Sequence, residues 1–220
     1  MKSILKIDLD HPDEEALEAM TRCLREGKVL LYPTDTVYGL GCDPFRPQAV
    51  QRIERLKGRA PGKSFILLIP DRQSAYDLMD GEPAAFRRFS DTLWPGPVTL
   101  VARAGRTVDR SLVGPRETVA MRWAGSRFLE TLFLKWPHPL LSTSANRTGE
   151  PPLDEPSTSL SPVVPAADLV IDGGPLRQPA SAIIDLSVTP PQLIRRGTLS
   201  DSLLAALGVA TETPGGNTCP

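Results

Sequence analysis

The sequence predicts an α/β protein, a single domain in which helices flank a twisted sheet of mixed strand direction. Three observations support this class. Short apolar runs typical of strands alternate with segments of helical periodicity. Several neighbouring strands look antiparallel, so the sheet is not purely parallel. The 220 residues, 40% of them hydrophobic, are enough for one substantial core.

The elements follow in order along the chain. An edge strand is expected over 3–9, and the next helix is expected to be capped by Asp10, to carry Pro12 in its first turn and to end at Gly27. A short apolar strand follows over 29–32. The remaining expected elements are helices over 47–57, 72–79, 83–93 and 126–135, and strands over 65–69, 98–103, 118–123, 168–172, 181–186 and 192–195, with one more beginning at 139–142.

Two segments fall outside this pattern. Residues 151–165 carry five prolines among serines and acids, which is typical of a stiff linker or of a loop over a pocket. The strands on either side favour the loop. The chain lacks an apolar period from about residue 209, so we expect a domain over 1–208 and a disordered tail over 209–220.

Charge and composition exclude several classes of protein. With 25 basic and 26 acidic side chains, the surface as a whole does not suit the binding of DNA or RNA, although this charge is compatible with a local basic pocket. Three cysteines without a CxxC spacing and two histidines exclude a disulfide framework and predict no metal site. The N-terminus turns acidic early and no run of about 18 apolar residues occurs, so we expect a cytoplasmic protein without a membrane partner.

A basic turn follows the expected helix over 47–57. Lys57, Arg59 and Lys63 project from it, in a segment that resembles a phosphate-binding P-loop. Three residues separate its glycines where four are required, and the turn leaves a helix where a P-loop opens one. A P-loop is therefore rejected. The cations either bind an anion or lie in solvent at a helix C-terminus, which favours positive charge.

Two further features have more than one interpretation. Ser142, Ser144 and Asn146 can bind phosphates or hydroxyls, or can simply satisfy their own turn; a Ser144 nucleophile is rejected because no GxSxG motif surrounds it. Arg122 lies among apolar residues and needs an anion, which is either a structural acid or a substrate carboxylate. Arg195 poses the same question.

Seven segments in this order resemble the YrdC-like family of threonylcarbamoyl-AMP synthases, over about residues 3–205. They are Tyr32-Pro33-Thr34-Asp35-Thr36-Val37-Tyr38-Gly39-Leu40-Gly41, Lys57-Gly58-Arg59, Trp94-Pro95-Gly96-Pro97-Val98-Thr99, Thr118-Val119-Ala120-Met121-Arg122, Ser142-Thr143-Ser144-Ala145-Asn146, Ser181-Ala182-Ile183-Ile184-Asp185, and Leu193-Ile194-Arg195-Arg196-Gly197.

The resemblance implies an enzyme, a nucleotidyltransferase with a concave basic cavity. It condenses L-threonine, bicarbonate and ATP into threonylcarbamoyl-AMP and pyrophosphate, and so serves the modification of a tRNA adenosine beside the anticodon. Magnesium is expected to enter with ATP. The implied partner is a downstream tRNA threonylcarbamoyl transferase complex, with at most weak binding of RNA.

The same resemblance assigns site residues. The expected catalytic cations are Lys57 and Arg59. The expected threonine pocket consists of Thr34, Thr36, Arg122, Ser142 and Ser181. The expected nucleotide side consists of Arg59, Lys63, Thr118, Ser144, Asn146 and Arg195.

Three alternatives remain open. A non-catalytic RNA-binding or ribosome-maturation factor of the same fold is disfavoured by the near-neutral charge and the 5% aromatic content. A paralogue without the synthase activity is disfavoured because this chain keeps the Lys-x-Arg turn and the Ser-Ala-Asn triplet. A carbamoyl-phosphate-processing module is disfavoured, because such a module is expected as one part of a longer chain.

Overall fold

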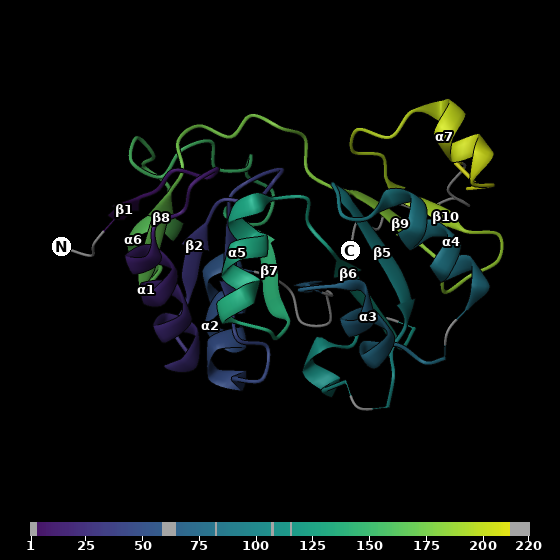
Figure 1. Cartoon of the computed structure of the whole chain (residues 1–220), viewed down its shortest axis with the longest axis horizontal. Coiled ribbons are helices and arrows are strands. Elements are labelled where there is room, and N and C mark those ends of the chain that lie inside the picture. Colours follow the sequence, from purple (N-terminus) through teal and green to yellow (C-terminus); the bar gives the residue numbers. More distant parts are fainter. Residues whose placement is uncertain (1–3, 59–64, 82, 107, 115, 212–220) are drawn as a thin grey trace. The chain divides into compact units, whose positions relative to one another are not determined.

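The computed structural model describes residues 4–58, 65–81, 83–106, 108–114 and 116–211. The chain forms two compact units (Figure 1). Unit 1 comprises residues 1–61 and 125–178, and unit 2 comprises residues 62–124 and 179–220.

Unit 1 is built on strands of mixed direction. In the order in which they pair, they are β1 (Ile4–Lys6), β8 (Leu169–Asp172), β2 (Leu30–Tyr32), β3 (Gly39–Cys42) and β7 (Leu140–Ser144). The β1–β8 and β8–β2 pairs are parallel, whereas the β2–β3 and β3–β7 pairs are antiparallel. Strand β2 is buried along its whole length, as its continuous apolar sequence predicts.

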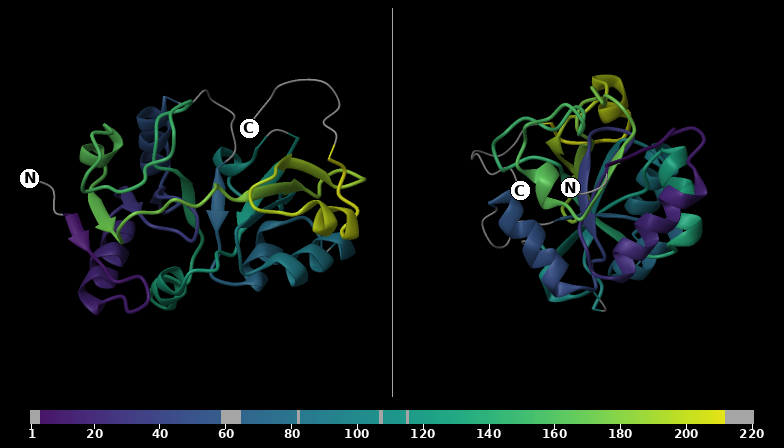
Figure 2. Two further views of the ribbon diagram at one scale, coloured as in Figure 1. Left: turned by 90° about the horizontal axis from the view of Figure 1, so that it is seen from above. Right: turned by 90° about the vertical axis from the view of Figure 1, so that its left-hand side faces the viewer.

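Helices cover both faces of these strands. They are α1 (Glu14–Arg25), α2 (Pro47–Lys57), α5 (Arg127–Lys135) and the short α6 (Val163–Ala166). Helices α1 and α5 pack together on one face, whereas α2 and α6 lie on the other (Figure 2). Helix α2 contacts β3, and its last residue, Lys57, contacts Ser144 at the end of β7.

Unit 2 repeats the mixed strand pattern with different elements. Its strands pair in the order β4 (Ile66–Leu68), β6 (Thr118–Arg122), β5 (Val98–Arg103), β9 (Ala182–Asp185) and β10 (Gln192–Arg195). Its helices are α3 (Arg72–Leu78), α4 (Ala84–Leu93) and α7 (Asp201–Ala206), with a 3₁₀ turn over Arg110–Leu112. Helix α4 packs on β5 through a buried face that includes Phe86 and Phe89.

Most predicted elements are confirmed, and the mixed α/β class is correct. The structure corrects the cap of α1, because Asp13, and not Asp10, accepts the hydrogen bond from the backbone N–H of Ala16. Strand β3 was not predicted at all. Its sequence, Gly-Leu-Gly-Cys, has two glycines and no alternation of apolar and polar residues, so only its pairing with β2 and β7 makes it a strand.

The C-terminal segment differs in part from the expectation of a tail beginning at residue 209. Val209 is buried, and Ala210 exchanges backbone hydrogen bonds with Pro191 and Leu193. Residues 212–220 of the expected tail lie outside the described residues. Within the described ranges, no helix has the length and apolarity needed to cross a membrane.

Candidate functional site

The polar residues predicted as functional form separate hydrogen-bonded clusters in each unit, and those of one unit are together called its set. In unit 1, Lys57 ends helix α2 and is only 5% exposed. Its ammonium donates to the Ser144 carbonyl at 2.7 Å, to the Asn146 Oδ1 at 2.7 Å and to the Ser144 Oγ at 3.3 Å. Gly58 then takes a left-handed conformation with φ of +58°, which stops the helix at this point. The structure therefore brings together Lys57, the first residue of the Lys-x-Arg turn, and the Ser-Ala-Asn triplet.

The Ser144 and Asn146 side chains are themselves held in place. Ser144 Oγ donates to Asn146 Oδ1 at 2.6 Å, and Asn146 Nδ2 donates to the Glu150 carbonyl at 2.5 Å. The orientation of the amide is therefore set at both of its ends. The C-terminal end of α2 is also tied to this turn through the backbone, since Thr148 N donates to the Lys57 carbonyl at 3.0 Å.

A hydroxyl turn follows strand β2. Thr34 Oγ1 accepts from the backbone N–H groups of Thr36 at 3.1 Å and Val37 at 3.2 Å, and lies 3.1 Å from Thr36 Oγ1. Both threonines are buried. Asp35, between them, accepts from the Gly125 N–H at 3.1 Å. The prediction of clustered hydroxyls at this strand end is confirmed.

The set in unit 2 is built around two arginines. Arg122 is 4% exposed, which confirms its predicted burial. Its Nε donates to the Gly96 carbonyl at 3.1 Å, and the Gly96 N–H donates to the Trp123 carbonyl at 2.8 Å. The rigid Trp-Pro-Gly-Pro corner thus fixes the plane of the Arg122 guanidinium.

Arg195 is anchored in a similar way at the end of β10. Its Nε donates to the Ser181 carbonyl at 2.7 Å and its Nη2 to the Ser181 Oγ at 3.1 Å. The Ser181 hydroxyl lies 3.0 Å from Thr99 Oγ1. Thr118, also predicted as functional, is buried at the start of β6, opposite Arg103 of β5.

Two polar residues of these sets were not predicted as functional. They are Thr99, beside Ser181, and Tyr32, whose hydroxyl donates to Ser142 Oγ at 2.8 Å. Both belong to segments that carry the family resemblance. A signal was present for Tyr32, because a tyrosine in a wholly apolar strand needs a partner for its hydroxyl.

Other predicted features have separate outcomes. Arg59 and Lys63 lie outside the described residues, so their predicted roles stay predictions.

Within the described part of the chain, three or more His, Cys, Asp or Glu side chains nowhere come together in an arrangement able to hold a metal ion. Burial raises the pKa of the Cys23 thiol to about 12 and also raises that of Cys42, so both remain neutral thiols that fill space in the core.

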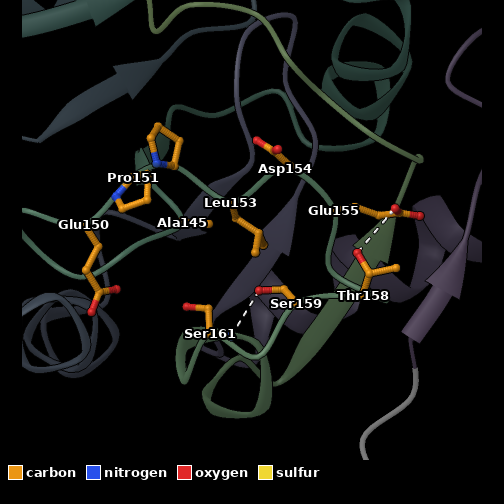
Figure 3. A pocket seen from close by; sticks show the side chains of 10 residues that line it. Ala145, Glu150, Pro151, Leu153, Asp154, Glu155, Thr158, Ser159 and Ser161 are labelled. Atoms are coloured by element: carbon orange, nitrogen blue, oxygen red, sulfur yellow. Dashed lines mark hydrogen bonds between the residues drawn. The ribbon is translucent and has the colours of Figure 1, made fainter.

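The segment after the Ser-Ala-Asn triplet lines a pocket of about 360 Å³ within unit 1 (Figure 3). Ala145, Leu153 and Asp154 contribute to its wall together with hydroxyl residues such as Thr158 and Ser159. Figure 3 shows Leu153 pointing toward Ser159, and Thr158 turned toward Glu155. The proline-rich segment thus lines a pocket of its own unit, whereas its role as a loop or lid over a ligand pocket stays a prediction.

Fold and polar residues together define a class: a mixed α/β protein in which buried cations are held beside serine, threonine and asparagine side chains, a combination suited to anionic ligands. The chain belongs to the Sua5/YciO/YrdC family, whose model, described as "Telomere recombination", matches residues 22–197.

Individual relatives agree with this membership. The threonylcarbamoyl-AMP synthase of Thiobacillus denitrificans is 39% identical over 178 residues, which cover 79% of this chain and 93% of that protein. The threonylcarbamoyl-AMP synthase of Coxiella burnetii is 37% identical over 140 residues, which cover 63% of this chain and 75% of that protein.

Solved structures give the same result. The crystal structure of P. abyssi Sua5 complexed with L-threonine matches with a TM-score of 0.85 and 30% identity, over 93% of this chain and 60% of that one. The crystal structure of E. coli YciO matches with a TM-score of 0.83 and 28% identity, over 91% of this chain and 98% of that one. This chain therefore spans somewhat less than two thirds of the Sua5 chain and nearly all of YciO.

Proposed function

We propose that this protein is an enzyme that condenses L-threonine, bicarbonate and ATP into threonylcarbamoyl-AMP, with release of pyrophosphate. The observation that carries the proposal is the match to Sua5 complexed with L-threonine, which extends over 93% of this chain. Relatives named threonylcarbamoyl-AMP synthase, at 37–39% identity, support it. The Lys57 cluster is further support, because it keeps the polar turn and the cation in contact.

The chemistry sets what the residues have to do. The threonine amine first condenses with bicarbonate to a carbamate, with loss of water, and a carbamate oxygen then attacks the α-phosphorus of ATP in line with the departing pyrophosphate. Both reactants are anions, so fixed positive charge and hydrogen-bond donors must offset their repulsion. The protein need not supply a general base, because a substrate phosphate or water can take the proton.

On the threonine side, we propose that Arg122 binds the carboxylate, and that Thr34, Thr36, Ser142 and Ser181 hydrogen-bond the amino acid. The fixed plane of Arg122 supports this assignment, because a guanidinium held at its Nε can present a planar edge to a carboxylate. A protein group that hydrogen-bonds the threonine hydroxyl would favour threonine over valine, because valine would leave that group unpaired.

On the nucleotide side, we propose that Arg59 and Lys63 act on the triphosphate with Thr118, Ser144, Asn146 and Arg195, and that magnesium enters bound to ATP. Lys57 and Arg59 remain the proposed catalytic cations. The Lys57 charge adds to the field at the phosphates, and its ammonium also orients Ser144 and Asn146 through the bonds described above.

The decisive experiment uses the purified chain with ATP, bicarbonate and L-threonine. We expect pyrophosphate release that requires both threonine and bicarbonate, and a labile adenylate detectable by mass spectrometry. Replacing threonine by valine is the matched control and is expected to give little product. Absence of threonine-dependent pyrophosphate would contradict the proposal.

Several parts of the proposal go beyond the catalytic step. The concave basic cavity, the cytoplasmic location, delivery to a tRNA threonylcarbamoyl transferase complex and weak binding of RNA all stay predictions. Tight RNA binding that falls steeply with salt, without turnover, would favour the RNA-binding alternative.

A further inference from the structure

Tyr32 and Ser142 lie on strands that are not neighbours. Strand β3 runs between their strands, β2 and β7. Tyr32 is paired with Gly39, and Ser142 is paired with Gly41. Residues opposite one another in an antiparallel pair share a face of the sheet, so all four positions face the same side. The Tyr32 side chain must therefore cross β3 to place its hydroxyl 2.8 Å from Ser142 Oγ.

Two glycines make this crossing possible. A Cβ at Gly41 would lie 2.7 Å from Tyr32 Cε1 and 2.7 Å from the Leu141 carbonyl oxygen, closer than real Cβ atoms approach. A Cβ at Gly39 would lie 3.1 Å from Ser142 Oγ and 3.3 Å from Tyr32 Cζ. The unusual Gly-Leu-Gly sequence of β3 thus leaves a slot on one face, which the buried Tyr32 ring fills.

The direction of the hydrogen bond determines what Ser142 can offer a ligand. Tyr32 is the donor, so the Ser142 oxygen accepts and keeps its own single proton for another partner. Among the described residues, no acceptor is recorded for that proton. Ser142 is only 7% exposed, so water has little access to it. The Ser142 hydroxyl is therefore set up as a donor toward an oxygen of a bound molecule.

We propose that Tyr32 is a positioning residue: through the glycine slot it holds Ser142 Oγ and commits the Ser142 hydroxyl to donate to an acceptor oxygen of L-threonine. The inference rests on the proposed function, which places threonine at Ser142. It adds a specific task for Tyr32, Gly39 and Gly41, none of which needs to touch the substrate.

The test is a double-mutant cycle with Tyr32→Phe and Ser142→Ala. Tyr32→Phe removes one oxygen and keeps the ring in its slot. We expect each single change to raise the KM for L-threonine about 3- to 10-fold, as for the loss of one neutral hydrogen bond, with the KM for ATP unchanged. Because the two groups act in series, the double variant should be no worse than Ser142→Ala alone.

Tyr38→Phe is the matched control. Tyr38 is an equally buried tyrosine that donates to the Gly174 carbonyl at 2.6 Å and accepts from the Gly173 N–H at 2.9 Å. Its loss should lower the melting temperature and leave the KM for threonine unchanged.

The outcomes separate the two proposals. If the wild type neither binds nor uses threonine, the proposed function fails and this inference fails with it. If the wild type uses threonine but Tyr32→Phe matches it, or if the effects of Tyr32→Phe and Ser142→Ala multiply in the double variant, only the inference is overturned. An equal rise in the KM for ATP and for threonine would show a merely structural role for Tyr32.

Discussion

The cations of the two units are held in different ways. In unit 1, the Lys57 ammonium contacts the Ser144 backbone carbonyl and also the Ser144 and Asn146 side chains, which are themselves predicted to bind ligand. In unit 2, Arg122 and Arg195 each use Nε to contact a backbone carbonyl, that of Gly96 or Ser181, and Arg195 Nη2 also contacts the Ser181 hydroxyl. A lysine is a flexible point charge, whereas an arginine has a planar fork that can be fixed at one edge. The lysine therefore orders other side chains, whereas the arginines are ordered by the chain.

The largest effect is expected at Arg122, where the comparison predicts that charge alone is insufficient. Arg122→Ala should lower kcat/KM for threonine by about 10²- to 10³-fold, since a preorganised group is lost, and should change the KM for ATP far less. Arg122→Lys keeps the charge but loses the bond to Gly96, so its kcat/KM for threonine should stay close to that of Arg122→Ala. Arg59→Ala should impair the use of ATP far more than the use of threonine. Equal losses for both substrates in steady-state kinetics would contradict this division.

Lys57 is expected to act mainly on the nucleotide side. Lys57→Met removes the donor that orients Ser144 and Asn146, and should raise the KM for ATP about 10- to 100-fold, the range for hydrogen bonds to a charged group. Arg55→Met is the matched control, because Arg55 is an exposed cation in the last turn of the same helix. Titration of each variant with ATP at fixed threonine measures the effect, and an equal loss in both variants would mean that only the net charge of the helix end matters.

In both units, a glycine lies against a neighbouring backbone carbonyl where a side chain would not fit. Replacing each glycine by alanine tests whether the backbone of the two units resists the added Cβ equally. A Cβ at Gly41 would lie 2.7 Å from the Leu141 carbonyl oxygen, and one at Gly96 would lie 2.8 Å from the Leu93 carbonyl oxygen. Gly41→Ala and Gly96→Ala should each lower the free energy of unfolding by about 1–3 kcal/mol in urea denaturation.

The control for this pair is Gly58→Ala. The Gly58 Cβ would meet nothing within 4 Å, although the φ of +58° makes alanine unfavourable by about 1 kcal/mol. A larger loss of unfolding free energy for Gly58→Ala than for Gly41→Ala and Gly96→Ala would show that the close contacts at Gly41 and Gly96 do not make alanine unfavourable there.

The smallest effect is expected at Thr99, whose hydroxyl lies 3.0 Å from that of Ser181, the residue that anchors Arg195. Thr99→Val replaces the hydroxyl by a methyl group of similar size and should raise the KM for threonine about 3-fold. Ser181→Ala should raise the same KM more. Kinetics with threonine varied would detect the difference. If Thr99→Val were the worse variant, Thr99 and not Ser181 would be the residue that contacts the ligand.

Local sequence was sufficient for much of the fold and for the candidate site. Helix α2 and strand β5 follow from periodicity and from an apolar run, because these signals depend only on neighbours along the chain. The buried Arg122 and the hydroxyls after β2 could also be predicted, since polar groups beside apolar strands stand out. Strand β3 could not be, because its glycines have no strand preference of their own.

Which polar atoms meet was decided only by the tertiary structure. Lys57 and Ser144 are 87 residues apart, and Tyr32 and Ser142 are 110 residues apart, so no local pattern relates them. Sequence determined that a cation, a tyrosine and several hydroxyls lie at element ends. Pairing of β3 with strands on both sides, and packing of α2 against it, determined which of them share hydrogen bonds, because those contacts depend on chain segments brought together only by folding.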